Sequence, residues 1–251
     1  ITVAMDTAVS QGDSIGAIVF VNQVAANTSY TLEVDSVTST HNTGTSNLTT
    51  NSVASGLWNN LTSGGLSGFT ISQNGGVLWI RKSDGSNFDI DATDGQGNSH
   101  LTLVKNSVQT FTDLPTTAPN NFVVEVKGDD TTNFDNYYVK FITNNGGTFE
   151  KGQWEETLKG GITYKINHDK MPHVLLRQAD GNFRFARADG DTYTINSVDY
   201  TLPKWGERTV GDQDTAPDPT LVGTKINNVF FFRNRLGFLA DDNVCMSRVS
   251  E

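Results

Sequence analysis

Short stretches of alternating or mostly apolar residues, separated by turn residues, occur along most of the chain. Examples are AIVFV from Ala17, SYTLEV from Ser29, FVVEV from Phe122 and YYVKF from Tyr137. Runs of this length, rich in β-branched and aromatic residues and bounded by Gly, Asn and Asp, are typical of strands. The pattern predicts a mainly β (α+β) protein built from small antiparallel sheets.

One segment follows a helical period instead. Val53, Leu57, Trp58 and Leu61 stand at i, i+4, i+5 and i+8, which places them on one face of a helix. A Ser, Thr and Asn-rich tract from Asp35 to Ser52 precedes them. We predict one short helix here, the only convincing helix in the chain.

The chain also contains an internal repeat at a constant offset of 96 residues. GLWNNLTSGGL from Gly56 aligns with GQWEETLKGGI from Gly152, which places Trp58 over Trp154. We predict that both tryptophans pack under their sheets. An aromatic platform for a ligand is the alternative interpretation.

Two Asp-Gly pairs align at the same offset. They lie in VLWIRKSDGSNFDI from Val77 and in VLLRQADGNFRF from Val174. Asp-Gly favours a tight hairpin turn, because Gly adopts positive φ without steric cost. Both stretches are therefore predicted to be β-hairpins.

The repeat predicts three segments. Residues 1–115 form a first repeat unit with an N-terminal lead-in, residues 116–203 a second unit, and residues 204–251 the start of a truncated third β segment. TTAPN is the expected linker between the two units. The chain begins without Met and stops directly after a dense apolar stretch. We therefore expect it to be a fragment of a longer protein.

Charge and cysteine content narrow the function. The formal net charge of −10 argues against a protein that reads DNA in a groove, since its averaged field repels phosphates. Cys245 is the sole cysteine, which excludes an internal disulfide, and it is interpreted as a half-buried strand residue. Apolar runs stay well short of the roughly 20 residues that span a bilayer. We expect a soluble protein without membrane insertion.

A possible nucleophile motif occurs near the N-terminus. Gly12-Asp13-Ser14-Ile15-Gly16 fits G-x-S-x-G, the spacing that holds a nucleophilic serine on a strained turn between a strand and a helix. Here the residues before Ser14 are polar, and the residues after it alternate like a strand. We interpret Ser14 as part of a turn that leads into a strand.

No other stretch carries a convincing catalytic or cofactor motif. The four histidines, His41, His100, His168 and His173, lack an acid-base context, and HDKMPH lacks the metal-binding spacing of a helix. Neither a P-loop nor a dinucleotide fingerprint is present, so no cofactor is expected. Glu155 and Glu156 are neighbours on a strand, so they point to opposite faces and cannot act as a glycosidase pair.

Two acidic stretches resemble calcium loops in part. DIDATDGQGN offers Asp89, Asp91, Thr93 and Asp94, but its Gly stands one place late for an EF-hand and no Glu closes the loop. GDDTTNFDN from Gly128 is similar. We interpret both as solvated turns, with incidental ion binding as the alternative, and predict no metal site.

Several separated motifs in the last third occur together and in order. They are Met171-Pro172-His173, Trp205, Arg208, Gly211-Asp212, Pro217-Asp218-Pro219, Phe231, Arg233-Asn234-Arg235-Leu236-Gly237-Phe238 and Ser247. With these motifs the chain resembles the tail tubular protein B family, the nozzle subunits of short-tailed phages. The resemblance is close over residues 170–251, weaker before them and weakest over residues 1–50.

The resemblance implies a structural virion protein and not an enzyme. Subunits of that family form a homohexameric ring below the portal and adaptor rings, with tail fibres docked nearby. The ring is the tail tube through which DNA is ejected. Membership therefore implies a place in the virion tail, assembly in the host cytoplasm, and transient passage of DNA without specific binding. An acidic wall would suit such a conduit.

The signature residues are expected to be structural. Arg233 and Arg235 are predicted to form bidentate pairs with carboxylates such as Asp241 or Asp242, locking either a turn or a subunit contact. An anion or DNA site at these arginines is the alternative.

Two other functions stay open at this point. A tail-associated depolymerase would need a carboxylate pair in a cleft lined by Trp58, Trp79 or Trp154. A polysaccharide-binding adhesin would need only the aromatic surface. The tandem repeat favours a scaffold, because repeated units build surfaces more readily than asymmetric active sites.

Overall fold

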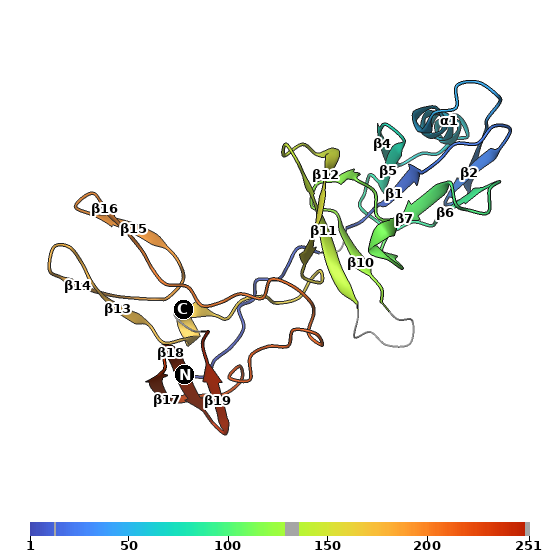
Figure 1. The fold of residues 1–251 in the computed structure, drawn as a ribbon. Helices are drawn as coiled ribbons and strands as arrows, with labels where there is room; N and C mark the ends of the chain where they lie inside the picture. Colours follow the sequence, from blue (N-terminus) through green and yellow to red (C-terminus); the bar gives the residue numbers. More distant parts are fainter. Residues whose placement is uncertain (13, 129–135, 249–251) are drawn as a thin grey trace. The chain divides into compact units, whose positions relative to one another are not determined.

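The protein consists of several small, mostly antiparallel sheets and one α-helix among the residues described (Figure 1). The computed structural model describes residues 1–12, 14–128 and 136–248. The predicted mainly β fold class is confirmed.

The chain folds into two compact units. Unit 1 comprises Ile1–Gly12 and Gly160–Glu251, and unit 2 comprises Asp13–Lys159. Unit 2 is therefore an insertion within unit 1. These boundaries differ from the predicted segments 1–115, 116–203 and 204–251, and the division by repeats stays a prediction about the sequence.

Unit 2 is built on three sheets. Their orders are β4-β5-β1-β7, β3-β2-β6 and β8-β10-β11-β12-β9, with β8 and β10 the parallel pair. The strands are β1 (Ala17–Val21), β2 (Ser29–Val34), β3 (Val37–Asn42), β4 (Phe69–Asn74), β5 (Val77–Lys82), β6 (Ile90–Asp94), β7 (Leu101–Val104), β8 (Ser107–Val108), β9 (Thr117–Pro119), β10 (Val123–Val126), β11 (Tyr137–Thr143) and β12 (Phe149–Thr157).

Strand β1 is buried on both faces. Ala17, Val19 and Val21 belong to a core shared with the helix and with the sheet β3-β2-β6. Ile18, which points to the opposite face, belongs to a second core with β10 and β11. The near-continuous apolar sequence of β1 follows from this double burial.

Helix α1 (Thr50–Ser63) confirms the predicted helix. Thr49 caps its N-terminus, with its side chain accepting a hydrogen bond from the Ser52 N–H. Three of the four residues expected on the apolar face, Val53, Leu57 and Leu61, are fully buried. Trp58 is 37% exposed, so its predicted packing under a sheet is wrong. The i+5 position lies at the edge of the apolar stripe, where the ring faces solvent.

Trp154 follows the prediction. It lies on β12, packs edge-on against Phe141 at a ring distance of 5.0 Å, and donates a hydrogen bond of 2.8 Å to the carbonyl oxygen of Pro115. The aligned residue Trp58 lies on a helix. The repeat therefore aligns a helix with a strand at this place, and the two tryptophans are not equivalent in three dimensions.

One of the two predicted hairpins forms. Strands β13 and β14 pair around Asp180-Gly181, with Leu175 opposite Phe185. The hairpin predicted around Asp84-Gly85 is wrong, because β5 pairs with β1 and β4 whereas β6 pairs with β2. A turn does follow β5, but the chain then crosses to another sheet. The Asp-Gly pair signals the turn and does not select the partner strand.

Unit 1 contains two hairpins and one three-stranded sheet. The hairpins are β13-β14 and β15-β16, and the sheet has the order β17-β18-β19. The strands are β13 (Val174–Arg177), β14 (Phe183–Ala186), β15 (Thr192–Ile195), β16 (Val198–Thr201), β17 (Ile226–Phe232), β18 (Arg235–Ala240) and β19 (Asn243–Met246). Cys245 is half-buried on β19, as predicted.

The N-terminal residues are part of unit 1. Isolated bridges join Val9 to Thr163 and Met5 to Ile166, and another joins Thr2 to Lys225. Val3 is 1% exposed in the core of this unit. The first residues of the chain thus pair with later segments of unit 1 (Figure 1).

The helix packing generates a test. Leu57→Ala should lower the free energy of unfolding by about 2 to 5 kcal/mol, since it leaves a cavity in a fully buried site. Trp58→Ala should cost less than Leu57→Ala, because Trp58 is 37% exposed whereas Leu57 is fully buried. Urea denaturation of both variants measures the difference. Equal losses would contradict the helix orientation described here.

Candidate functional site

The signature residues all lie in unit 1, where several of them share one core. Trp205 packs against Phe238, with ring centroids 5.7 Å apart. Met171 and Phe238 are buried in the same cluster, and Leu236 packs against it. Motifs that are up to 67 positions apart in the sequence thus meet in one place.

Arg208 is the centre of a polar network beside this core. Its side chain is 8% exposed and forms an ion pair of 2.6 Å with Asp218. It also donates hydrogen bonds to the carbonyl oxygen of Thr163 and to the side-chain oxygen of Gln213. The guanidinium therefore joins three chain segments. Asp218 belongs to the proline turn singled out in the sequence, but nothing in the sequence indicated that it pairs with Arg208.

Gly211 and Asp212 form the turn that precedes this proline turn. Gly211 has φ of +78°, and the Asp212 carboxylate accepts hydrogen bonds from the backbone N–H groups of Asp214 and Thr215. Both signature residues therefore shape the loop that carries Gln213 and Asp218 to Arg208.

The segment Arg233-Asn234 is a tight turn between β17 and β18. Both residues have positive φ, 49° and 61°. Gly237 follows on β18, and a Cβ there would lie 2.3 Å from the Phe230 ring. The signature glycine is therefore required by close packing of an aromatic ring on the sheet. Ser247 extends the β18-β19 pairing through hydrogen bonds with Leu236.

The predicted pairs of Arg233 and Arg235 with Asp241 or Asp242 do not form. Among the described residues, no ion pair involves these four side chains, and Arg233 lies 5.3 Å from the Phe232 ring centroid. The arginines flank the turn at one end of β18, and the aspartates form the turn at its other end. A six-residue strand separates the two ends by about 20 Å.

Met171-Pro172-His173 leads into the hairpin β13-β14. The His173 ring stacks on Phe185 at 5.2 Å, and its Nδ1 lies 3.1 Å from the carbonyl oxygen of Met171. Pro172 cannot donate a backbone hydrogen bond, so the strand begins only after it. This motif therefore positions the hairpin relative to the core.

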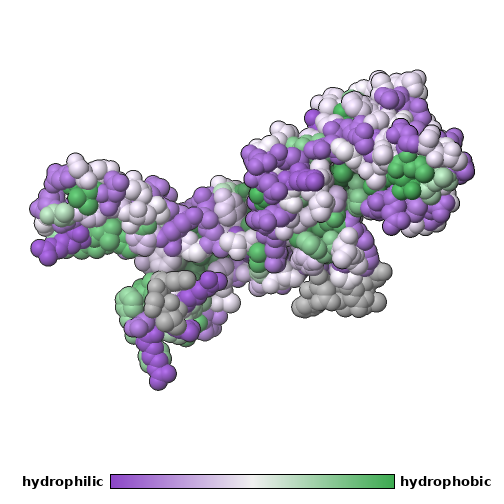
Figure 2. Space-filling model, turned by 45° about the horizontal axis from the view of Figure 1, so that its top comes forward, coloured by the Kyte–Doolittle hydropathy of each residue, from purple (hydrophilic) through white to green (hydrophobic). Residues whose placement is uncertain are grey.

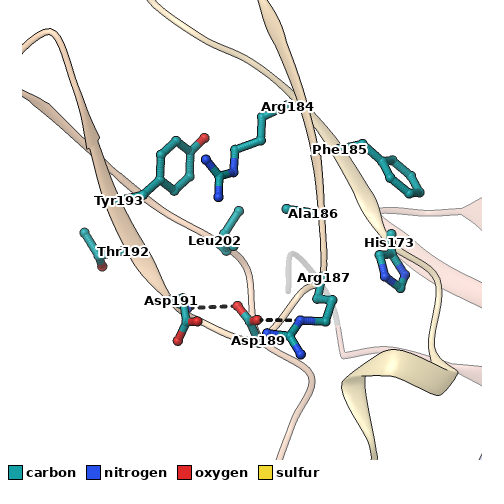
Figure 3. A pocket seen from close by; sticks show the side chains of 10 residues that line it. All are labelled: His173, Arg184, Phe185, Ala186, Arg187, Asp189, Asp191, Thr192, Tyr193 and Leu202. Atoms are coloured by element: carbon teal, nitrogen blue, oxygen red, sulfur yellow. Dashed lines mark hydrogen bonds and ion pairs between the residues drawn. The ribbon is translucent and has the colours of Figure 1, made fainter.

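A polar cleft of 440 Å³ lies in unit 1 between β14 and β15 (Figure 3). Arg184 stacks on the Tyr193 ring at 4.1 Å across it. At its floor Arg187 pairs with Asp189 at 3.2 Å and with Asp169 at 3.2 Å. The hydrogen bond and charge of Asp169, with the charge of Asp189, raise the pKa of Arg187 above its ordinary value. Arg187 therefore stays cationic and cannot serve as an acid or base.

A second polar hollow of 290 Å³ adjoins the first and shares Arg187, Asp189 and Asp191 with it. Within the residues described, no group of three or more His, Cys, Asp or Glu side chains is placed to hold a metal ion. The carboxylates here face arginine or lysine instead, as Asp6 faces Lys165 at 3.9 Å. In both hollows, carboxylates and basic side chains thus neutralise each other on a polar surface.

Ser14 lies in an irregular segment, and β1 follows it, as predicted, where a nucleophile elbow needs a helix. Its hydroxyl oxygen accepts a hydrogen bond of 2.7 Å from the Val123 N–H. The side chain thus holds the segment before β1 against β10.

The histidines have different surroundings. His100 lies 3.3 Å from the buried Tyr30 hydroxyl, His41 lies against Gly56 of the helix, and His168 begins the short 3-10 helix His168–Lys170. None of these sites combines a histidine with a nucleophile and a carboxylate among the contacts described.

The stretch DIDATDGQGN consists of strand β6 followed by a turn that one carboxylate organises, so only its second half is the predicted turn. Asp94 accepts hydrogen bonds from the backbone N–H groups of Gln96, Asn98, His100 and Leu101. Burial alone would raise the pKa of Asp94, but these hydrogen bonds outweigh it and hold the pKa below its ordinary value of 3.8. The carboxylate oxygens are thus occupied by the chain itself, as expected for a turn.

The other acidic stretch, GDDTTNFDN from Gly128, falls mainly on residues 129–135, outside the described residues.

The tryptophans considered for sugar binding do not share a cleft. Trp79 is covered by Arg81 at 3.7 Å, Trp154 is half-buried on β12, and Trp58 lies on the helix surface. Neither of the two hollows in unit 1 is lined by a tryptophan. Glu155 and Glu156 are paired with different residues of β11, Lys140 and Val139, consistent with opposite faces.

None of the helices in the described part of the chain has the length and apolar character needed to cross a bilayer.

Comparison with known proteins agrees with this structural interpretation of the site. Residues 1–251 match the family model described as bacteriophage nozzle protein. The chain belongs to this family. It is also 35% identical over 187 residues to the tail tubular protein gp12 of Escherichia phage T7, which covers 74% of the chain and 21% of that relative. The resemblance noted in the sequence is thereby confirmed. The match spans about a fifth of the length of this curated relative.

In this nozzle family member the signature residues that the structure describes serve packing, turns and one ion-pair network. Sequence reasoning found the motifs but missed what they contact. Gln213 and Thr163, which bind Arg208, stood in no motif, because their contribution depends on which segments meet.

The Arg208 network generates a test in unit 1. Arg208→Ala should lower the free energy of unfolding by about 2 to 4 kcal/mol, because Asp218 and the Thr163 carbonyl lose a nearly buried partner. Arg208→Lys should cost less, since it keeps the charge. Thermal unfolding compares both with Arg177→Ala, which removes an exposed arginine. A loss no larger than that of the control would contradict the role of the network.

Asp94 generates a pH-dependent test in unit 2. Asp94→Asn should lower the free energy of unfolding at pH 7 by about 1 to 3 kcal/mol, because its NH₂ would face backbone donors. The native carboxyl has its pKa depressed by folding, so its stabilisation is complete above the unfolded pKa and is lost as the pH falls through the folded pKa. The difference between native protein and variant should therefore shrink below about pH 4.

Urea denaturation at pH 7, 5 and 3 measures this difference. Asp91→Asn, at an exposed position on the same strand, is the matched control. A difference between native protein and Asp94→Asn that stays constant with pH would show that the charge of Asp94 is not responsible.

Proposed function

We propose that this chain is part of a structural subunit of a phage tail tube, the nozzle through which DNA leaves the virion. The match of residues 1–251 to the nozzle family carries the proposal. The relative from phage T7, named a tail tubular protein, supports the same role. The structure is consistent with this role. The signature residues take part in core packing, in turns and in one ion pair. Among the residues described, none of them belongs to a catalytic arrangement.

The subunit is proposed to act in the virion tail without enzymatic activity or a cofactor. Its partners are other copies of itself in a homohexameric ring, a tail adaptor ring and tail fibres. Assembly takes place in the host cytoplasm before the tail is complete. These finer statements follow the family resemblance.

The acidity of the chain supports passage of DNA without specific binding. A formal net charge of −10 repels phosphates on average, so a wall made of such subunits would let the duplex slide. A basic wall would release counterions and hold DNA in a salt-dependent way. The cations that the structure describes are also partly neutralised, as Arg187 and Arg208 are by aspartates.

A polysaccharide-binding adhesin or depolymerase has no comparable support. The three tryptophans considered for it lie at separate sites, and the adjacent pair Glu155 and Glu156 cannot flank one bond.

The test is the assembly state of the whole protein that contains this chain. Light scattering should give the mass of a hexamer or of a monomer that becomes hexameric with its adaptor ring. Negative-stain electron microscopy should then show six-fold rings with a central channel. A protein that stays monomeric and shows no ring, even with the adaptor ring added, would overturn the proposal.

A further inference from the structure

The two hairpins of unit 1 pack against each other through one face each. Arg184 of β14 stacks on Tyr193 of β15 at 4.1 Å, and the two side chains face each other across the cleft (Figure 3). The Gln178 side chain donates a hydrogen bond of 3.4 Å to the Tyr193 hydroxyl, and the Ala179 N–H donates one to the Tyr200 hydroxyl of β16. Each hairpin therefore has an inner and an outer face, because side chains alternate along a strand.

The outer face of β13-β14 is apolar and carries one cation. Register places Leu175 opposite Phe185, and Arg177 opposite Phe183. Leu175 and Phe183 are each 64% exposed, and Phe185 is 71% exposed. In the described part of the chain Arg177 enters no ion pair. We call these four residues the phenylalanine face.

A residue of the family signature holds this face in place. The His173 ring stacks on Phe185 at 5.2 Å, on the side of the strand that points away from Tyr193 (Figure 3). An exposed ring that is already held loses little side-chain entropy on binding. Figure 2 shows hydrophobic surface among hydrophilic residues at the left, in the part that holds these hairpins. Contiguous apolar surface of this kind marks a contact site.

The outer face of β15-β16 is polar and carries one carboxylate. Register places Thr192 opposite Thr201, and Thr194 opposite Asp199, and all four are exposed. The Thr192 and Thr201 hydroxyls share a hydrogen bond of 2.9 Å, and the Thr194 hydroxyl donates one of 2.6 Å to Asp199. These hydroxyls already have partners, so an apolar surface can cover this threonine face without leaving them unpaired.

Arg177 and Asp199 lie at similar levels on the two outer faces. Arg177 belongs to the last register pair before the β13-β14 turn, and Asp199 to the second-last before the β15-β16 turn. Both turns lie at the same end of the hairpin pair (Figure 1). Their neighbours Gln178 and Tyr200 each contact the opposing hairpin. The pair therefore has a cation on one side and a carboxylate at a matching place on the other.

We propose that the phenylalanine face of one copy binds the threonine face of the next copy in the tail ring. The two copies have the same orientation, so Arg177 of one meets Asp199 of the next. The contact is heterologous, because a different surface serves each partner, and contacts of this kind close into rings. The apolar side chains leave water against the threonine methyl groups. This inference rests on the proposed function and names the surfaces that join its subunits.

The charges favour a second copy over nucleic acid or lipid. Aromatic side chains with arginines also suit single-stranded nucleic acid and anionic membranes. Here, however, Arg184 stacks on a tyrosine within the hairpin pair, and Arg187 is paired with two aspartates. Arg177 is left as the cation of this hairpin that can reach a partner, within a chain of net charge −10. One carboxylate on the threonine face matches it.

The experiment is a charge exchange in the whole protein that contains this chain. R177E makes both outer faces acidic, and D199K makes both basic. Each variant alone should need at least about tenfold higher concentration than the native protein for half-maximal ring assembly, because like charges meet at every contact. Mixed in equal amounts, the two should assemble like the native protein. Six subunits can alternate around a ring, and every contact then joins opposite charges.

Sedimentation velocity at several concentrations measures assembly, with the adaptor ring present in every sample, and far-UV circular dichroism verifies that each variant is folded. The matched control pair is K170E and D214K, which reverses exposed charges of unit 1 outside both faces. These controls should assemble like the native protein. F183S removes a largely exposed ring, so it should weaken assembly without unfolding the protein, and mixing with D199K should not restore it.

Recovery on mixing R177E with D199K is the result expected, and misfolded variants cannot produce it. If the native protein forms rings and both variants form them equally well, the contact is overturned while the proposed function stands. Weakening without recovery also overturns it, because the faces are then covered by another part of the protein or by a different partner. A native protein that forms no ring overturns the proposed function, and this contact with it.

Discussion

Unit 1 depends on the pairing of the first twelve residues with segments more than 150 positions away. The Ser10 N–H donates to the Ile162 carbonyl oxygen at 2.7 Å, and the Asp6 N–H donates to the Lys165 carbonyl oxygen at 2.9 Å. Val3 is buried in the same core as Phe238. Unit 2 leaves the chain of unit 1 after this N-terminal segment and returns to it at Gly160, so unit 2 is an insertion in the sequence of unit 1. The loop-closure entropy of the insertion grows only slowly with its length.

Local features of the fold could be predicted from the sequence, and long-range pairing could not. The helix, the β13-β14 hairpin and the strand character of β1 follow from periodicity and turn residues within a few positions. The insertion could not be found, because ITVAMDTAVSQ has no strong pattern and forms only isolated bridges. The first Asp-Gly turn was recognised, but the partner of the next strand is set by the core that both sheets share.

The aligned glycines show why a sequence repeat need not be a structural one. A Cβ at Gly56 would lie 2.0 Å from the His41 ring, so this glycine lets the helix approach β3. A Cβ at Gly152 would lie 2.0 Å from the Ile142 carbonyl oxygen, so this one lets β12 approach β11. Glycine is thus required at both positions, but for two different steric reasons. Likewise the site could be predicted only as motifs, since the partners of Arg208 follow from the fold.

Few interactions within unit 1 stabilise its fold. Its buried core is small, its two hairpins are two-stranded, and such hairpins are marginally stable in water without further packing. Most of the exposed large apolar side chains described also belong to this unit, including Phe185 and Phe231 at 71% and 79% exposure. Exposed apolar surface of this kind suits a structural subunit. It is unfavourable in the free chain, and its burial at a contact makes the free energy of assembly more favourable. Unit 2, in contrast, has two larger cores that bury β1 from both faces.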